Sequence, residues 1–369
     1  MTVIADGGVL DQTGPVNDAF RNCIPLPAGV IRVTAPIGVT ATTSGFSNGG
    51  ALRGQPGFQT TIIADYDGDP TRGGIIQIGT AGSGMYSMGN VIEDLVLRPA
   101  TGRTNLNGIS LTSAWNTTIN RVWMPNGCHN GIITPFRPDI DAVSDRYQCW
   151  SLIVKQVFIQ QCYGNAFDFA AGQSPGGLHV SYSQGIQCRG VGMHLTTGQC
   201  EIINNVLSYN GIGGLLFDSR EGPSQMAFVA QNEIQDNQYY GINVIRSRNM
   251  RLIQNRFLAT TYSSADPTGF PQPGGPFMKQ AVHVNFDGAG EVLNLLAERN
   301  QHKTANGSTV TTSDCYGYDA AAGTLSADFP SNFVKNEFGP MPIDGITQNS
   351  TGFRKYIGIS APAGLIIDP

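Results

Sequence analysis

The sequence predicts an all-β solenoid, a chain wound into stacked coils of about 25 residues, on two observations. First, one pattern is written twice, because INNVLSYNGIGGLLF at 203–217 returns as AQNEIQDNQYYGINV at 230–244. Asn205 and Asn232 hold matching places 27 residues apart, and Asn255 opens a third copy after 23 more. Second, 47 Gly and 21 Pro with 13% charged residues describe short apolar strands between frequent turns. The chain should therefore hold roughly 10 to 12 coils in a single domain covering residues 1–369.

The expected elements follow this rhythm from the N-terminus. Residues 15–23 are compatible with a short helix that caps the first coil, because an open strand edge invites pairing with another chain. Coils are expected over 24–300, starting with a strand in which Val30, Arg32 and Thr34 alternate. Further strands are expected at 49–64, 73–79, 90–99, 107–133, 152–161, 165–169, 191–195, 280–286 and 291–300. Residues 301–369 are expected to form C-terminal loops and last strands, or an intersubunit element.

Charge and cysteine content limit the classes of partner. The net charge is −5, so the chain has no electrostatic footprint for nucleic acid, and no apolar run is long enough for a membrane. Seven widely spaced cysteines do not form a disulfide scaffold or a zinc site, and we expect buried free thiols. The N-terminus has no signal peptide pattern, so either the signal has been removed or the protein is not exported by that route.

Three stretches resemble a known superfamily. The run at 15–23, LPAGVIRV at 26–33 and LRGQPGFQTTI at 52–62 are similar to the right-handed parallel β-helix proteins of the pectate-lyase-like superfamily. That superfamily includes phage tailspike depolymerases and polysaccharide hydrolases and lyases. Its acidic motif of the kind DGxTDDT is kept only in outline, in ADGGVLDQTGPVNDAF. The resemblance implies a right-handed parallel β-helix, a polysaccharide or oligosaccharide partner, and an extracellular or virion location. For tailspike-like members it also implies a homotrimer, although no coiled-coil heptads follow the repeats to register three chains.

Strand alternation suggests where chemistry lies. In the strands of the type NGISL and NAFDF, the residue after Gly or Ala is apolar and should point inward, so the next residue should point outward. This gives one outward row and a second row two residues later. The first row is Ser110, Ile133, Asp168, His194, Leu216, Asn243 and His283, and the second is Thr112, Pro135, Ala170, Thr196, Asp218, Ile245 and Asn285.

Asp168, His194 and Asp218 should therefore share one exposed patch. Two coils separate the carboxylates, about 9 to 10 Å by strand spacing, near the upper end for an inverting glycosidase. We expect Asp168 and Asp218 as acid and base with His194 assisting, and Glu221 as the alternative acid. The competing interpretation is that both aspartates bond nearby backbone at strand ends and that His194 is an ordinary surface residue.

Other residues form the expected binding surface. Arginines could neutralise a uronate, aromatic rings could stack on sugars, and polar residues of the outward row could bond hydroxyls. These candidates are Arg220, Arg246, Arg248, Asn243, His283, Tyr239, Tyr240 and Trp150. The insertions at 135–150 and 259–279 are expected as binding loops beside the same strands. The asparagines at 120, 205, 232 and 255 are expected to form a buried amide ladder rather than a binding row.

Three functions fit these residues. The first is a glycoside hydrolase that uses two carboxylates on the outer face of a parallel sheet. The second is a lyase acting on a uronic-acid polymer, for which the superfamily often uses Ca²⁺ held by clustered carboxylates, a cluster not found on these strands. The third is a glycan-binding tailspike or adhesion module without catalysis. For the hydrolase we expect no cofactor and no metal.

Overall fold

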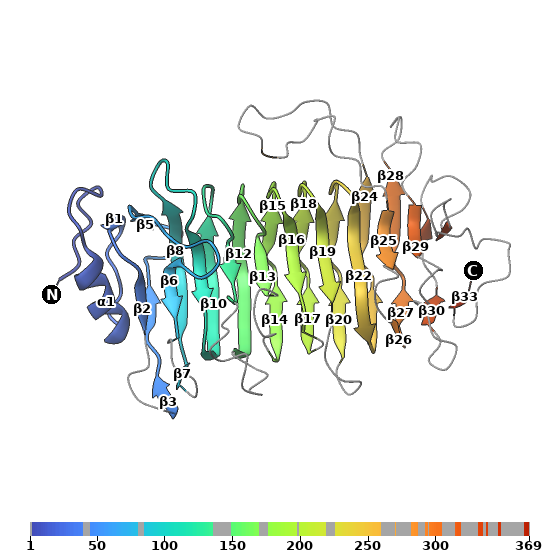
Figure 1. Cartoon of the computed structure of the whole chain (residues 1–369), viewed down its shortest axis with the longest axis horizontal. Coiled ribbons are helices and arrows are strands. Elements are labelled where there is room, and N and C mark those ends of the chain that lie inside the picture. Colours follow the sequence, from blue (N-terminus) through green and yellow to red (C-terminus); the bar gives the residue numbers. More distant parts are fainter. Residues whose placement is uncertain are drawn as a thin grey trace. The chain divides into compact units, whose positions relative to one another are not determined.

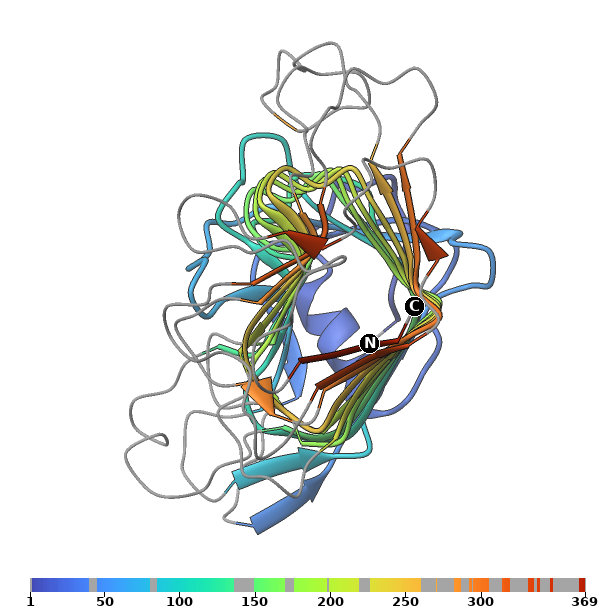
Figure 2. The same cartoon turned by 90° about the vertical axis from the view of Figure 1, so that its right-hand side faces the viewer.

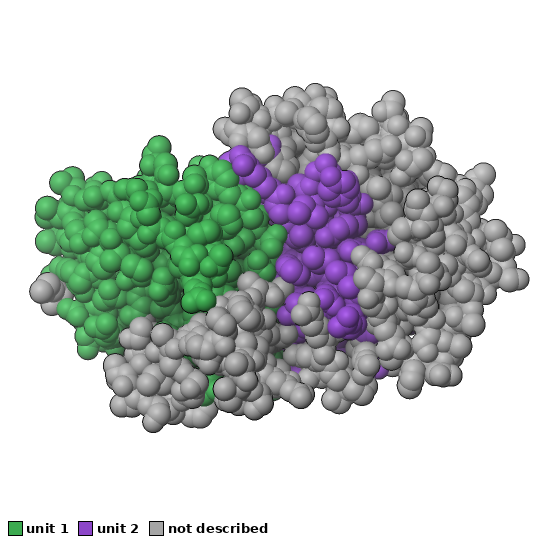
Figure 3. All heavy atoms as spheres, in the orientation of Figure 1, with its two compact units in different colours: residues 1–184 green, residues 185–369 purple. Residues whose placement is uncertain are grey.

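A computed structural model describes residues 2–368 except for several segments. The segments outside the description are 40–44, 80–84, 136–148, 170–175, 198, 219–225, 260–269, 271–281, 287–291, 294, 305–313, 319–330, 335–336, 339–345 and 348–364. The chain divides into two compact units, unit 1 at 1–184 and unit 2 at 185–369, coloured separately in Figure 3. The single domain and the number of coils stay predictions.

Unit 1 contains one helix followed by short strands. The helix is α1 (Thr13–Arg21). The strands are β1 (Gly29–Val33), β2 (Ile37–Val39), β3 (Gly45–Asn48), β4 (Ala51–Arg53), β5 (Thr60–Ala64), β6 (Gly74–Ile78), β7 (Met85–Met88), β8 (Val91–Pro99), β9 (Asn107–Leu111), β10 (Ala114–Met124), β11 (Ile132–Ile133), β12 (Trp150–Gln160), β13 (Phe167–Phe169) and β14 (Leu178–Ser181), and β15 (Gln184–Ile186) begins at the last residue of the unit. β2, β6, β9, β11 and β13 form the B sheet of unit 1, and β1, β5, β8, β10, β12 and β14 pair in sequence in its A sheet.

Unit 2 continues with strands alone among its described residues. They are β16 (Val191–Leu195), β17 (Cys200–Ile203), β18 (Val206–Ser208), β19 (Gly213–Asp218), β20 (Ala227–Ala230), β21 (Glu233–Gln235), β22 (Tyr240–Arg248), β23 (Met250–Ile253), β24 (Arg256–Ala259), β25 (Val282–Phe286), β26 (Val292–Leu293), β27 (Leu296–Glu298), β28 (Gln301–Thr304), β29 (Asp314–Tyr318), β30 (Ser331–Val334), β31 (Glu337–Phe338), β32 (Ile346–Thr347) and β33 (Leu365–Asp368). The B sheet of unit 2 is β16, β19, β22, β25, β29 and β32.

Both units are parallel β-helices, which confirms the predicted fold class. Every described strand pairing within a unit is parallel, such as β1 with β5, β9 with β11, and β19 with β22. In each unit the equivalent strands of consecutive coils lie side by side (Figure 1). The inward side chains are apolar and buried, because each coil is too thin to bury them without its neighbours. None of the described helical residues forms a segment long and apolar enough to cross a membrane.

Buried asparagines hold one corner of the coils in unit 2. The backbone N–H and side-chain amide of Asn205 donate to Asn232 Oδ1, those of Asn232 donate to Asn255 Oδ1, and those of Asn255 donate to Asn300 Oδ1, over 2.9–3.1 Å. The residue before each one has a positive φ, so the chain turns sharply and directs the next side chain inward. The predicted amide ladder is thus confirmed for Asn205, Asn232 and Asn255, and it extends to Asn300.

Asn120 was wrongly assigned to that ladder. It lies in β10 of unit 1, paired with Glu93 and Lys155, and its side chain is partly exposed. The reason is its place at the corner: Asn120 precedes the positive-φ residue Arg121, whereas each ladder asparagine follows such a residue. Glu93 and Asn120 lie 27 residues apart and pair with each other, so this coil has the same length as the repeat from Asn205 to Asn232.

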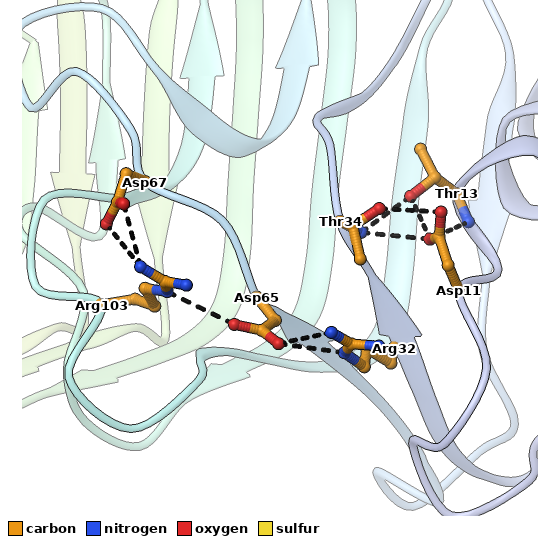
Figure 4. A network of polar contacts seen from close by, with 7 residues as sticks. All are labelled: Asp11, Thr13, Arg32, Thr34, Asp65, Asp67 and Arg103. Atoms are coloured by element: carbon orange, nitrogen blue, oxygen red, sulfur yellow. Dashed lines mark hydrogen bonds and ion pairs between the residues drawn. The ribbon is translucent and has the colours of Figure 1, made fainter.

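The predicted cap is confirmed as α1, which buries Val16, Ala19 and Phe20 along one face. Viewed down the long axis, α1 lies inside the outline of the unit 1 coils, where it covers their apolar interior (Figure 2). The segment before the helix is fixed by Asp11, whose carboxylate accepts hydrogen bonds from Thr13 and Thr34 (Figure 4).

A second polar cluster in the same unit joins segments far apart in sequence. Asp65 accepts from Arg32 of β1 at 2.6 Å and from Arg103 at 3.3 Å, and Arg103 also contacts Asp67 at 2.9 Å (Figure 4). Hydrogen bonds from the two guanidinium groups lower the pKa of Asp65. The sequence predicted Arg32 only as a residue of the alternating first strand, and its partners explain why a charged residue stands there.

The free thiols behave as predicted at most positions. Five are buried, at Cys128, Cys149, Cys162, Cys188 and Cys200. Burial raises the pKa of the Cys149 thiol to about 12, so it stays protonated at neutral pH. Cys23 is exposed at the end of the cap, which corrects the prediction for that residue, and the side chain of Cys315 lies outside the described residues.

Candidate functional site

The predicted register is confirmed in the B sheet of unit 1. Ile132 pairs with Ile109 and Phe167, and Ile133 pairs with Ser110 and Asp168. The inward partners Ile109, Ile132 and Phe167 are fully buried, as the alternation requires. The outward row is less open than predicted, because Ser110 and Ile133 are also buried. Ser110 Oγ donates to the carbonyl oxygen of Arg72 at 2.7 Å, so a loop covers this end of the row. Asp168 is its partly exposed member.

Asp168 lies in β13 with polar neighbours from the adjoining turns. Asn165 Nδ2 donates to Asp168 Oδ2 at 3.1 Å, which fixes the orientation of the carboxylate. His129 lies within electrostatic range of Asp168. Burial lowers the pKa of His129, and a hydrogen bond with the backbone of Thr104 and the charge of Asp168 offset this only in part. The lowered pKa favours the neutral form of the His129 imidazole.

The sequence analysis missed His129, although a signal for its place exists. It directly precedes Asn130, whose backbone N–H and side-chain amide both donate to Asn107 Oδ1 at 3.0 Å, and whose own Oδ1 accepts from the backbone of Asn165 at 2.7 Å. These asparagines form a second corner ladder, immediately before the B strands of unit 1. Recognising that ladder would have placed His129 beside the start of the strand pair that carries Asp168.

In unit 2 the register of the first three B strands is also confirmed. His194 pairs with Leu216, and Leu216 pairs with Asn243. The inward residues Met193, Leu215 and Ile242 are fully buried. His194 is partly exposed, so the outward row is accessible at this position. Asn243 is 8% exposed, so the row is largely covered there.

Asp218 ends β19 at a β-bulge that the sequence analysis did not foresee. Phe217 pairs with Val244, but Asp218 pairs with Arg246, which leaves Ile245 without a partner in β19. The predicted alignment of Asp218 with Ile245 is therefore wrong. As a result Arg246 Nε lies 4.0 Å from Asp218 Oδ1, with the arginine side chain 41% exposed and the aspartate 12% exposed. A bulge of this kind redirects a side chain without changing the strands around it.

The predicted place of His283 in the first outward row is also wrong. Asn243 pairs with Asn285 rather than with His283, and Asn285 Nδ2 donates to Asn243 Oδ1 at 2.8 Å. The strand keeps its predicted faces but is shifted by two residues, because alternation with period two cannot distinguish these registers. The side chain of His283 lies outside the described residues.

The predicted aromatic residues have different surroundings. Tyr239 is 57% exposed. The ring of Tyr240 covers Gly213 on the preceding coil, where any side chain would collide with it, so this tyrosine is held by packing. Trp150 is partly exposed and continues a row of rings with Tyr86 and Trp115, whose centroids lie 5.0 Å apart, with Trp150 6.3 Å beyond.

Some predicted site residues cannot be placed. Arg220, Glu221 and the side chain of Arg248 lie outside the described residues, as do most residues of both insertions. Asp218 is only 9% exposed, so its predicted exposed position is wrong. Asp168 belongs to unit 1, whereas His194 and Asp218 belong to unit 2, so the grouping of the three residues stays a prediction. Within the described part of the chain, no three His, Cys, Asp or Glu side chains gather as a metal site would need.

Comparison with known proteins gives a likeness in structure. No protein-family model matches the sequence, and no curated protein does. The A-module of mannuronan C-5 epimerase AlgE4 from Azotobacter vinelandii is 15% identical and has a TM-score of 0.52, with 92% of this chain and 94% of that chain covered. The AlgE6 A-module of the same organism is 15% identical with a TM-score of 0.47, over 100% of this chain and 97% of that chain.

A third similar structure is the enzymatically active domain of tailspike protein 2 from bacteriophage CBA120. It is 13% identical with a TM-score of 0.49, and 98% of this chain and 50% of that chain are covered. At 15% identity, the likeness to the AlgE4 module concerns the fold alone. Together with the all-parallel pairing within each unit, this likeness identifies the chain as a parallel β-helix protein.

Proposed function

We propose that the chain hydrolyses a polysaccharide, with Asp168 and Asp218 as the acid and base. The observation that supports this most is the placement of both carboxylates on B-sheet strands, each with a polar side chain beside it. Asp168 takes an outward, partly exposed position of β13 and accepts a hydrogen bond from Asn165. Asp218 ends β19, largely buried, with Arg246 beside it. A partly covered carboxylate on a rigid strand is a suitable acid or base, because its orientation is fixed before the substrate binds.

In the proposed reaction one carboxyl group protonates the glycosidic oxygen, so the leaving sugar departs as an alcohol. The other carboxylate takes a proton from water, whose oxygen attacks the anomeric carbon from the opposite face. Inverting glycosidases separate the two groups by about 6.5 to 9.5 Å. The separation of Asp168 and Asp218 stays a prediction, because the two residues belong to different units. His194 assists, Glu221 remains the alternative acid, and neutral His129 can accept a hydrogen bond beside Asp168.

A polysaccharide substrate is consistent with the name of the AlgE4 module, the protein of similar fold. The AlgE4 module carries the name of an enzyme of mannuronan, a polymer. A shared fold does not transfer chemistry, so the reaction is argued from the residues of this chain. A polysaccharide substrate also agrees with the proposed extracellular or virion location.

A second candidate is β-elimination of a uronic-acid polymer, and Arg246 is the observation that favours it. A lyase must neutralise the uronate and remove the proton next to it, and a guanidinium can supply the positive charge. The side chain of Arg246 is 41% exposed, so it can reach a ligand as well as Asp218.

The experiment is turnover on a panel of neutral and uronic-acid polysaccharides, followed by two readings. New reducing ends without ultraviolet absorbance indicate hydrolysis, and absorbance of the unsaturated product indicates elimination. Saturable binding with neither product indicates the third function, a glycan-binding module. Asp168→Asn and Asp218→Asn should abolish release of reducing ends while the proteins remain folded. Unchanged rates in both variants would reject the assignment.

A further inference from the structure

A polar groove of ≈ 550 Å³ lies at the asparagine-ladder corner of unit 2. Its lining alternates between two rows of side chains. One row consists of the positive-φ residues Gln231, Gln254 and Arg299, and the other of the first strand residues Glu233, Arg256 and Gln301. We call these six residues the corner groove. Neither the proposed hydrolysis nor any predicted binding residue uses it.

The corner groove follows from the sequence of each turn. The positive-φ residue points outward, the asparagine after it points into the ladder, and the next residue points outward again. The second row is kept in register by strand pairing, since Glu233 pairs with Arg256 and Arg256 with Gln301. The buried amides below, at Asn232, Asn255 and Asn300, fix the floor. Three consecutive coils therefore present the same pair of polar positions, about 4.8 Å apart.

The corner groove holds two arginines and one glutamate, and Glu298 beside Arg299 supplies a second carboxylate just outside the lining. Arg256 Nη1 lies 3.5 Å from Glu233 Oε2, and Arg299 Nε lies 3.3 Å from Glu298 Oε1. Both arginine side chains remain accessible, at 50% and 55% exposure. A polyanion would gain no net attraction here, because each guanidinium has a carboxylate beside it.

The hydrogen-bonding groups suit hydroxyls instead. Gln231 Nε2 donates to Gln254 Oε1 at 3.2 Å, so their other amide positions remain available for a ligand. Guanidinium groups only donate, carboxylates only accept, and amides do both, which together match a group that donates and accepts. A ligand that repeats such groups along its length would meet equivalent partners on each coil.

We propose that the corner groove binds a neutral oligosaccharide segment, lying along the stack of coils and apart from the B-sheet carboxylates. That the ligand is a saccharide rests on the proposed function. Its binding place and its lack of charge are inferred from the residues of the corner groove. In this way the protein would hold a polymer at a second place while another part of it is cleaved.

The test is calorimetric titration of the full chain carrying Asp168→Asn and Asp218→Asn, so that no sugar is consumed. The probes are maltohexaose, cellohexaose and laminarihexaose, with hexagalacturonate as the charged counterpart. We expect saturable binding of at least one neutral hexasaccharide. Adding Gln254→Ala and Arg256→Ala should weaken it about tenfold or more, the effect of one or two lost hydrogen bonds to charged or amide groups. Arg251→Ala, an arginine of β23 outside the groove, is the matched control and should change affinity less than twofold.

Three results would overturn the proposal: no neutral hexasaccharide binds, the groove variant binds as tightly as its parent, or hexagalacturonate binds more tightly than the neutral sugars. The two hypotheses can fail separately. Groove-dependent binding in a protein whose wild-type form cleaves no polymer would refute hydrolysis and leave the groove. Polymer cleavage without groove-dependent binding would refute the corner groove as a binding site and leave hydrolysis standing.

Discussion

Asn255 shows how a single side chain holds the corner of a coil. Its amide donates to the carbonyl oxygen of Val229 at 2.9 Å and to Asn300 Oδ1 at 3.1 Å, and its Oδ1 accepts two hydrogen bonds from Asn232. Asn255 is fully buried. Asparagine has the shortest side chain with a carboxamide, which supplies two donor hydrogens and a separate acceptor oxygen.

We therefore expect Asn255→Ala to lower the free energy of unfolding by about 3 kcal/mol, because the buried partners lose their hydrogen bonds and water cannot replace them. Thermal unfolding measures the change. The matched control is Gln254→Ala, at the exposed neighbouring position, which should shift stability by less than about 0.5 kcal/mol. Equal effects of the two substitutions would contradict a structural role for the ladder.

At the residue scale, the sequence was sufficient to predict a buried side chain where a repeated residue type coincided with a repeated backbone turn. Asn205, Asn232 and Asn255 satisfy that condition, so their burial was predictable. Asn120 did not follow a positive-φ residue, and sequence spacing alone could not reveal this. The neighbourhood of Asp168 and His129 was missed because it follows the corner ladder of Asn107, Asn130 and Asn165 rather than strand alternation.

The cap is the element whose stability should respond to acid. Asp11 accepts hydrogen bonds from the hydroxyl of Thr13 at 2.6 Å and of Thr34 at 2.7 Å. Burial raises the pKa of Asp11, but these bonds and those from the backbone outweigh it and lower the pKa to about 2 from 3.8. Through these hydrogen bonds, the carboxylate connects the segment before α1 to Thr34, the residue that follows β1.

Because the folded pKa of Asp11 is below the unfolded value, its contribution is complete above about pH 3.8 and is lost as the pH falls towards 2. Asp11→Asn should be less stable than wild type at pH 5, by less than about 1 kcal/mol because the group is exposed. The difference should shrink between pH 4 and 2 in thermal melts. A difference that stays constant over that range would show that the carboxylate charge does not hold the cap.

At the element scale, strand faces were more predictable than strand register. Inward and outward sides follow from period-two alternation, and they were right for β9, β11, β16 and β19. Two errors have physical causes. The bulge beside Asp218 adds one residue to β22, and β25 is shifted by two residues, which leaves its pattern of faces unchanged. Because an insertion precedes β25, the regular coil length could not be used to predict the register of this strand.

For the whole molecule, the resemblance to tailspikes predicts a homotrimer. Light scattering should then give three times the chain mass of 39.3 kDa. A mass equal to one chain at micromolar concentration would contradict this prediction.

The central claim for the whole molecule is that it hydrolyses a polysaccharide with Asp168 and Asp218. The most direct measurement is the rate of reducing-end release on the best polymer of the panel, for wild type, Asp168→Asn and Asp218→Asn. Each substitution removes a group that transfers a proton in the transition state, so we predict losses in kcat of about 100-fold or more, with melting curves like that of wild type. Glu201→Gln, an exposed carboxylate of β17 outside both the B sheet and the corner groove, is the control and should retain the rate. Wild-type rates in both aspartate variants would contradict the account.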